Sequence, residues 1–190
     1  LKVEDIVWTY SGLRPLQDTS EDNATAVTRD YSIKVNREDG VPLINVFGGK
    51  ITSYRKLAES VMDEVSLFFP QIRGPWTDKA YLPGGDFPVD GVSELIFDVL
   101  EAFPFLNGKW AKRLVKAYGK EAFEMLGSVR SEDELGLNFG ATLTQKEVEW
   151  LIKEEFATSA EDILWRRSKL GLRLSELQAK TLRDWIASQH

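Results

Sequence analysis

A pair of glycines, Gly48 and Gly49, separates a run of strand-forming residues from a run with helical periodicity. The start of a helix carries backbone N–H groups without acceptors and the positive end of the helix dipole, so it favours an anion or an electron-rich ring edge. Glycine lets such a ligand approach the backbone, Lys50 adds a positive charge, and Thr52 or Ser53 adds a hydroxyl. The alternative is a tight turn with Thr52 as a helix cap. Both interpretations stay open, because the spacing matches neither a phosphate loop nor a dinucleotide fingerprint.

Two arginines upstream of this junction could also bind an anion. Arg14 stands between Gly12 and Pro15, which hold the backbone stiffly, and a guanidinium held in this way suits bidentate binding of a phosphate or a carboxylate. Arg29 opens the next extended run and could converge with Arg14. The alternative for each arginine is a surface ion pair, and Arg29 fits it well because Asp30 is its neighbour.

A segment near the C-terminus, residues 162–169, combines one aromatic residue with several basic ones. We expect Trp165 to pack between helices, while Arg166, Arg167 and Lys169 face solvent or pair with neighbouring carboxylates. The acidic run 131–134 lacks the spacing of a metal-binding loop, so no metal site is predicted there.

The amino-acid composition excludes several kinds of catalytic and binding site within this chain. The 190 residues include no Cys, and the one His is His190, so disulfides, thiolate metal sites, cysteine nucleophiles and an internal imidazole base are excluded. The 30 acidic against 24 basic residues give a net charge of -6, which argues against a nucleic-acid partner. No G-x-G-x-x-G run follows a predicted strand, so the usual dinucleotide site is not predicted in this chain.

The first part of the chain predicts strands followed by one helix. Strand-forming residues cluster at 6–10, 29–36 and 43–47, and Asp39-Gly40 is a typical hairpin turn between the last two. Apolar residues then recur at helical spacing over 54–69 and stop at a proline.

The rest of the chain predicts a linker and a helical bundle. Pro and Gly recur through 70–90, too often for a regular element, and 91–190 predicts about five helices. The fold class is therefore α+β, with part of one domain at 1–69, a linker at 70–90 and a helical domain at 91–190. Three of the helices are expected to open with a capping pair: Thr144 with Glu147, Ser159 with Asp162, and Ser175 with Gln178.

Five motifs, taken together, resemble a known family. YSGLRPL (10–16), TRDY (28–31), VFGGKITSYRKLA (46–58), LPGG (82–85) and DILWRR (162–167) occur in this order and spacing. They are similar to the C-terminal end of the FAD-dependent glycerol-3-phosphate dehydrogenases, whose flavoprotein part resembles the D-amino-acid oxidase group. The resemblance covers essentially the whole chain.

The resemblance implies a substrate-side piece of a flavin domain followed by a helical cap. In this family the dinucleotide fingerprint lies near the N-terminus, so we expect the chain to be a fragment that is inactive alone and does not retain FAD by itself. The complete enzyme would oxidise sn-glycerol 3-phosphate to dihydroxyacetone phosphate. The general base is not assigned within this chain, and His190 is not a candidate.

By the same resemblance, three cationic residues would bind the substrate. Arg14 would lie over the flavin and hold the substrate, and Arg29 would help to bind its phosphate or polar end. Lys50 would lie close to both the phosphate and the flavin ring.

Residues of the glycine junction would contact the cofactor. Gly49, Lys50, Ile51 and Thr52 are implied as FAD-binding, through the backbone, the ammonium and the Thr52 hydroxyl. Ile51 and Ser53 replace the Leu and Thr that related chains often carry, so a contribution from the Ser53 hydroxyl is not assured by the resemblance.

The family generally passes electrons to a quinone at the cytoplasmic surface of the membrane. We therefore expect a cytoplasmic protein with peripheral membrane contact and a quinone-type acceptor; the oligomeric state stays open, with a homodimer as one expectation. The alternative function is a free-standing helical interaction module whose N-terminal strands pair with a partner chain.

Overall fold

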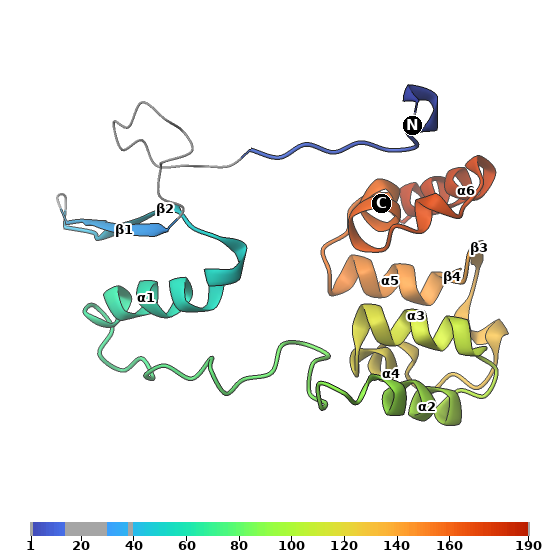
Figure 1. Ribbon diagram of the computed structural model, residues 1–190, viewed down its shortest axis with the longest axis horizontal. Coiled ribbons are helices and arrows are strands. Elements are labelled where there is room, and N and C mark those ends of the chain that lie inside the picture. The colour runs from blue at the N-terminus through green and yellow to red at the C-terminus, as the bar shows by residue number, and fades with distance from the viewer. Residues whose placement is uncertain (1, 14–29, 38–39, 190) are drawn as a thin grey trace. The chain divides into compact units, whose positions relative to one another are not determined.

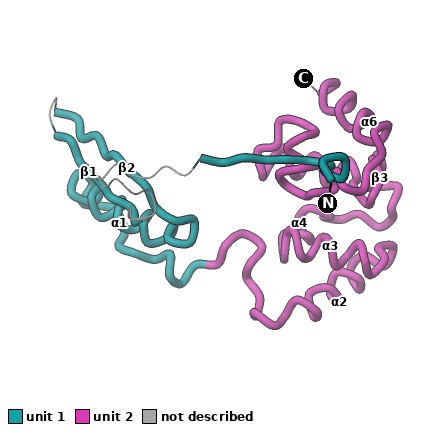
Figure 2. Tube along the Cα trace, turned by 45° about the horizontal axis from the view of Figure 1, so that its top comes forward, with its two compact units in different colours: residues 1–80 teal, residues 81–190 magenta. Residues whose placement is uncertain are grey.

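The computed structural model describes residues 2–13, 30–37 and 40–189. The chain divides into two compact units, residues 1–80 and 81–190, which Figure 2 shows in different colours. The first contains a β-hairpin and a helix, and the second is mainly helical (Figure 1). This arrangement confirms the predicted α+β fold class.

The first unit is built around the antiparallel hairpin of β1 (Tyr31–Asn36) and β2 (Leu43–Gly48), in which Tyr31 is opposite Gly48. Both strands were predicted. A short 3-10 helix, Ile51–Ser53, leads into α1 (Tyr54–Ser66), which lies along one side of the hairpin in Figure 1. The helix ends at Ser66, three residues before the predicted end.

The strand expected over 6–10 is wrong. A 3-10 helix, Val3–Asp5, is followed by residues without regular structure as far as 13. Val7 is 72% exposed, and Trp8 stacks on Tyr10 with ring centroids 5.5 Å apart. A strand needs a partner to satisfy its backbone groups, and among the described residues none pairs with this segment.

The first unit has almost no core of its own. Of its described residues, 2–13, 30–37 and 40–80, none is buried. The side chains of α1 that face the hairpin are only half-buried, because two strands and one helix are too few to enclose them.

The second unit holds the buried core. Its regular helices are α2 (Val92–Ala102), α3 (Gly108–Tyr118), α4 (Glu121–Leu126), α5 (Gln145–Lys153) and α6 (Glu176–Ala187). Between them lie two 3-10 turns, Glu132–Leu135 and Leu170–Leu172, a π-helix, Asp162–Arg167, and a two-stranded sheet of β3 (Asn138–Gly140) and β4 (Leu143–Thr144). The apolar side chains with less than 2% exposure include Val99, Leu114, Leu135, Phe139, Leu143, Val148, Leu151, Ile163 and Leu182.

Sequence periodicity missed the short elements of this unit. The helix α4 and the β3–β4 sheet were not predicted, because six-residue and three-residue elements carry too little periodic signal. The helix that begins after Thr144 ends at Lys153, and Phe156, beyond it, is 81% exposed with a φ of 57°.

Two of the three predicted capping pairs are present at the N-terminal ends of their helices. Ser175 and Gln178 form the expected reciprocal box at α6. Ser159 and Asp162 also bond reciprocally, and the pKa of Asp162 is lowered to about 2, chiefly by the Thr158 N–H and then by the Ser159 hydroxyl. The pair of Thr144 with Glu147 is wrong, since Thr144 makes no side-chain cap and Glu147 points into the core.

The loop before α2 is held against the end of α3 by two glycines. Gly84 (φ 69°) and Gly119 (φ 55°) touch so closely that a Cβ on either would lie 2.1 Å from a backbone oxygen, of Tyr118 and of Gly84 respectively. The Lys120 N–H donates to the Gly84 carbonyl at 2.9 Å. This contact explains why the LPGG sequence at 82–85 needs its first glycine.

Candidate functional site

The glycine pair shapes the end of β2 as the sequence suggested. Gly48 has a φ of 70° and Gly49 a φ of 99°, a region that residues with a Cβ rarely adopt. A Cβ on Gly49 would also meet the Tyr31 Cβ at 3.4 Å across the hairpin. The two residues therefore turn the backbone sharply out of the sheet and into the short 3-10 helix.

The hydroxyl that closes this turn belongs to Ser53. Its Oγ donates to the Lys50 carbonyl at 2.8 Å and accepts from the Lys50 N–H at 3.3 Å. Thr52, which the sequence offered as a cap, is exposed and makes no cap contact among the described residues, so the Thr52 hydroxyl is available to a ligand. The simple alternative, a turn capped by Thr52, is wrong in that detail.

Lys50 lies on the open side of the junction. Its ammonium is 3.7 Å from the Asp30 carboxylate, and the two side chains are 55% and 82% exposed. An exposed pair at this distance contributes little to stability, so an incoming anion could displace Asp30 at small cost. Arg14 and Arg29, the other predicted substrate-binding residues, lie outside the described residues.

The junction also exposes apolar surface. Ile51 is 90% exposed, and Tyr54 and Phe47 are 53% and 41% exposed. Large exposed apolar side chains close in sequence to an exposed cation indicate contact with another surface or with a ring. The described junction residues Gly49, Lys50, Ile51 and Thr52 thus share one accessible stretch of backbone.

A second set of contacts holds the Pro-rich segment against α1. The Glu59 carboxylate accepts from the Thr77 hydroxyl at 2.5 Å and from Arg55 at 2.6 Å, and Lys56 binds its other oxygen at 2.9 Å. The Thr77 hydrogen bond and then that of Lys56 lower the pKa of Glu59 to about 2. The i, i+4 spacing of Arg55 and Glu59 could have been found in the sequence, whereas Thr77 gives no such signal.

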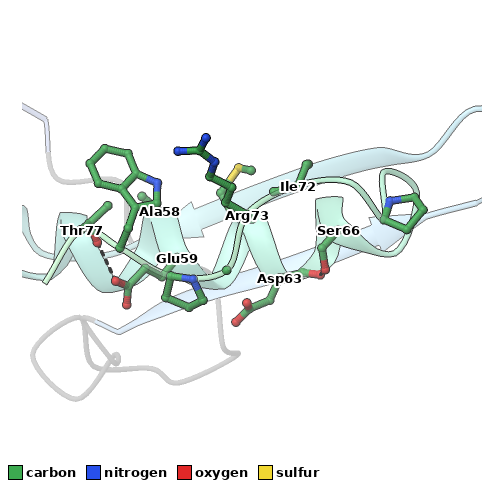
Figure 3. A pocket seen from close by; sticks show the side chains of 12 residues that line it. Ala58, Glu59, Asp63, Ser66, Ile72, Arg73 and Thr77 are labelled. Atoms are coloured by element: carbon green, nitrogen blue, oxygen red, sulfur yellow. Dashed lines mark hydrogen bonds between the residues drawn. The ribbon is translucent and has the colours of Figure 1, made fainter.

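A pocket of about 540 Å³ lies between α1 and residues 70–77. Figure 3 shows Glu59 joined to Thr77 at one end, and Arg73 with its guanidinium turned away from that carboxylate. Met62 and Trp76 contribute apolar walls. This pocket was not predicted, because its two sides come from α1 and from a segment without regular structure after the end of that helix.

One network of charged residues in the second unit has a structural role. Arg113 forms a bidentate pair with Glu147, at 2.6 Å for both bonds, and Tyr118 donates to the same carboxylate at 2.7 Å. Burial and then the charge of Glu147 raise the pKa of Tyr118. Burial alone would lower the pKa of Arg113, but Glu147 outweighs it and raises that pKa. Sequence spacing could not reveal this network, since Glu147 lies on α5 while Arg113 and Tyr118 lie on α3.

The basic segment 162–169 behaves as expected. Trp165 is half-buried, and its ring packs where a Cβ on Gly171 would meet it at 2.5 Å. Arg166 pairs with Asp162 at 2.9 Å, and Arg167 donates to the Glu155 carbonyl at 2.9 Å.

Within the described residues, no group of three or more acidic, His or Cys side chains is placed to hold a metal ion. In the same part of the chain, no helix combines the length and apolarity needed to cross a bilayer.

Comparison with known proteins gives related sequences along the whole chain. A glycerol-3-phosphate dehydrogenase of Pseudomonas aeruginosa is 41% identical over 191 residues, and the aerobic glycerol-3-phosphate dehydrogenase of Escherichia coli is 37% identical over 187. A D-erythritol 1-phosphate dehydrogenase of Brucella abortus is 36% identical over 186. These matches cover 100%, 98% and 98% of this chain but 37% of each relative, so the chain spans little more than a third of their length.

The family comparison covers more than half of the chain. Residues 75–187 match the C-terminal domain of alpha-glycerophosphate oxidase, a range that contains all the helices of the second unit. The chain therefore belongs to the family defined by that C-terminal domain.

Proposed function

We propose that this chain works as the C-terminal part of an FAD-dependent dehydrogenase that oxidises sn-glycerol 3-phosphate to dihydroxyacetone phosphate. The glycine junction carries this proposal, because it presents a cation, a hydroxyl and open backbone on one accessible stretch. Two of the relatives named above are glycerol-3-phosphate dehydrogenases. The helical unit would be the cap of the complete enzyme.

The junction residues fit a flavin edge. The positive φ values of Gly48 and Gly49 turn the backbone out of the sheet, and exposed Ile51 offers an apolar contact. Gly49, Ile51 and Thr52 would bind FAD through backbone and hydroxyl groups. The chemistry that bound FAD would supply is hydride acceptance from the alcohol-bearing carbon of the substrate.

Lys50 would act by charge and position. Its ammonium and the helix start place positive potential at the ring edge and toward the substrate phosphate. Arg14 and Arg29 would hold the substrate by bidentate bonds, and their part in the site rests on the sequence resemblance. The alcohol proton would go to a base supplied from outside this chain.

The first unit supports a role within a larger protein. Its hairpin has two strands and its described side chains are not buried, so added strands and an apolar face would complete it. We accordingly propose that the isolated chain does not retain FAD and is inactive. A free-standing helical module with partner-paired strands is the alternative.

Location and partners follow from the same proposal. We propose a cytoplasmic enzyme in peripheral contact with the membrane that reduces a quinone-type acceptor, with a homodimer as its assembly.

The proposal is tested in the complete enzyme by Lys50→Ala. Losing a charged contact to substrate should lower kcat/KM for glycerol 3-phosphate by about 10-fold to 100-fold, the equivalent of roughly 1.5–3 kcal/mol, in a dye-linked assay. Lys50→Arg should restore part of the loss, and Lys79→Ala, an exposed lysine of the same unit, should leave kcat/KM unchanged.

The substrate is tested in the same assay with D-erythritol 1-phosphate, because one relative at a similar identity is a dehydrogenase of that compound. A preference for it would replace glycerol 3-phosphate in the proposal. An unchanged kcat/KM in Lys50→Ala on both substrates would remove Lys50 from the site.

A further inference from the structure

The exposed face of α3 carries a row of positive charge. Lys109, Lys112 and Lys116 are spaced three and four residues apart, so they lie on one side of the helix and span about 10 Å along its axis. The opposite side is buried through residues such as Trp110, Leu114 and Tyr118. Like charges at this spacing destabilise a helix, so the row is not explained by the stability of α3.

This row forms one wall of a groove in the second unit. The groove has a volume of about 560 Å³. Its other wall consists of residues 168–173, the segment that comes after the π-helix. Its lining includes six basic residues: Lys109, Lys112, Arg113, Lys116, Lys169 and Arg173. No carboxylate is among the groove-lining residues of the described chain.

Four of these six cations form no ion pair with the part of the chain that the structure describes. Arg113 is neutralised by Glu147, and Lys169 donates to the Trp165 carbonyl. In residues 40–189, Lys109, Lys112, Lys116 and Arg173 form no ion pair within 4.0 Å. In a chain with a net charge of -6, four uncompensated cations around one groove are a strong local reversal of potential.

The wall opposite α3 is rigid and strained. Lys169 adopts a left-handed backbone with a φ of 60°, two residues after the π-helix ends at Arg167. Left-handed non-glycine residues and π-helices both occur often at functional sites. Leu170 is buried beneath this turn, so the Arg173 side of the groove is fixed to the core.

We infer that this groove binds a ligand carrying several closely spaced phosphate groups. Phosphate oxygens accept from Lys as a point charge and from Arg as a fork, which suits both walls. A row of about 10 Å exceeds the reach of one phosphate, so an oligophosphate fits it better than a single ion. The same chemistry exists in a soluble oligophosphate and in clustered phospholipid headgroups.

The experiment compares the 190-residue chain with two double variants. Lys112→Glu with Lys116→Glu reverses the groove, and Lys153→Glu with Lys180→Glu reverses two exposed lysines that do not line it. Calorimetric titration with tripolyphosphate should give saturable binding. The groove variant should bind at least about tenfold more weakly, since two charged contacts are reversed, and the control should match the unaltered chain. Circular dichroism checks that both variants fold.

Three further arms identify the source of the phosphate. Orthophosphate should bind more weakly than tripolyphosphate, and added salt should weaken binding as the Debye length falls from about 30 Å at 0.01 M to about 8 Å at 0.15 M. Phosphatidylcholine vesicles with phosphatidylglycerol, but not without it, should bind the chain if headgroups are the source, and tripolyphosphate should then compete. Binding to tripolyphosphate without binding to vesicles assigns a soluble ligand.

The inference is overturned by any of three results. One is that the unaltered chain binds neither tripolyphosphate nor anionic vesicles. Another is an equal loss in the control variant, which would show that net charge rather than the groove matters. The third is equally tight binding of hexaglutamate, which would mark an acidic peptide surface instead.

Discussion

Glu147 is buried with a relative exposure of 1%, and its neighbours explain how a charge is tolerated there. Arg113 binds both of its oxygens and Tyr118 donates to one of them, so the charge is paired and hydrogen-bonded. Arg113 also donates to the Thr142 carbonyl and hydroxyl, where the backbone has a φ of 68°. The Glu147 carboxylate thereby connects α5 to α3, and Arg113 connects α3 to the β3–β4 turn.

We predict that Glu147→Gln destabilises the chain by about 3–5 kcal/mol, because it leaves the Arg113 guanidinium without its counter-charge inside the protein. Urea unfolding followed by circular dichroism measures the change. Asp184→Asn, which removes an exposed partner of Lys180, is the matched control and should cost at most about 1 kcal/mol. Equal losses in both variants would contradict the special role of Glu147.

Side-chain contacts between residues far apart in the sequence were not predicted. The sequence singled out Glu147, but as a helix cap beside Thr144, since local spacing is all that a pattern can measure. Its true partner, Arg113, is 34 positions away. The glycine junction was more predictable, because positive φ at Gly48 and Gly49 is a local backbone requirement. The positions of Arg14 and Arg29 stay predictions.

At the scale of elements, long periodic segments were predictable and short ones were not. Clustered strand-forming residues in β1 and apolar residues at helical spacing in α1 predicted the correct element type and nearly the correct ends. The short β3–β4 sheet was missed, and residues 6–10 were assigned a strand from propensity alone. Propensity could not show whether a partner strand is present, which decides the outcome.

The contact between Gly84 and Gly119 gives a prediction for one element. We predict that Gly119→Ala lowers the free energy of unfolding by about 2 kcal/mol or more, because the new Cβ would sit 2.1 Å from the Gly84 oxygen at a positive φ. Gly108→Ala is the control: Gly108 lies in the first turn of α3 with no atom within 4 Å of a new Cβ, so this change should be neutral or slightly stabilising. Thermal unfolding of both variants decides between the effects. A neutral Gly119→Ala would mean that the loop at 82–85 is not held against α3.

At the scale of the whole molecule, the two units differ in what stabilises them. Residues 81–190 enclose a continuous apolar core, whereas the described part of residues 1–80 contains no buried side chain. Burial of apolar surface is the main favourable term in folding, so the helical unit should be the more stable of the two. The sequence indicated a boundary in the Pro-rich region but not this difference, since burial depends on which faces meet.

We predict that amide hydrogen exchange in the isolated chain is much slower in α3 and α5 than in α1 and the β1–β2 hairpin. Amides of the helical unit should approach the protection of global unfolding, while those of the first unit open locally. Mass spectrometry of peptides after timed labelling measures both. In the complete enzyme the first unit should gain protection, and equal protection of the two units in the isolated chain would contradict the proposed dependence on further structure.

The Gly84 to Lys120 hydrogen bond has a practical consequence for anyone who excises the helical unit. The acceptor of that bond lies upstream of α2, so a cut placed just before Val92 would discard it along with the packing of Phe87. Such a shortened polypeptide would contain α2 to α6 and still lose the hydrogen bond that holds the loop against the C-terminal end of α3. The smallest autonomous piece should therefore begin before Leu82, several residues earlier than secondary structure alone would advise.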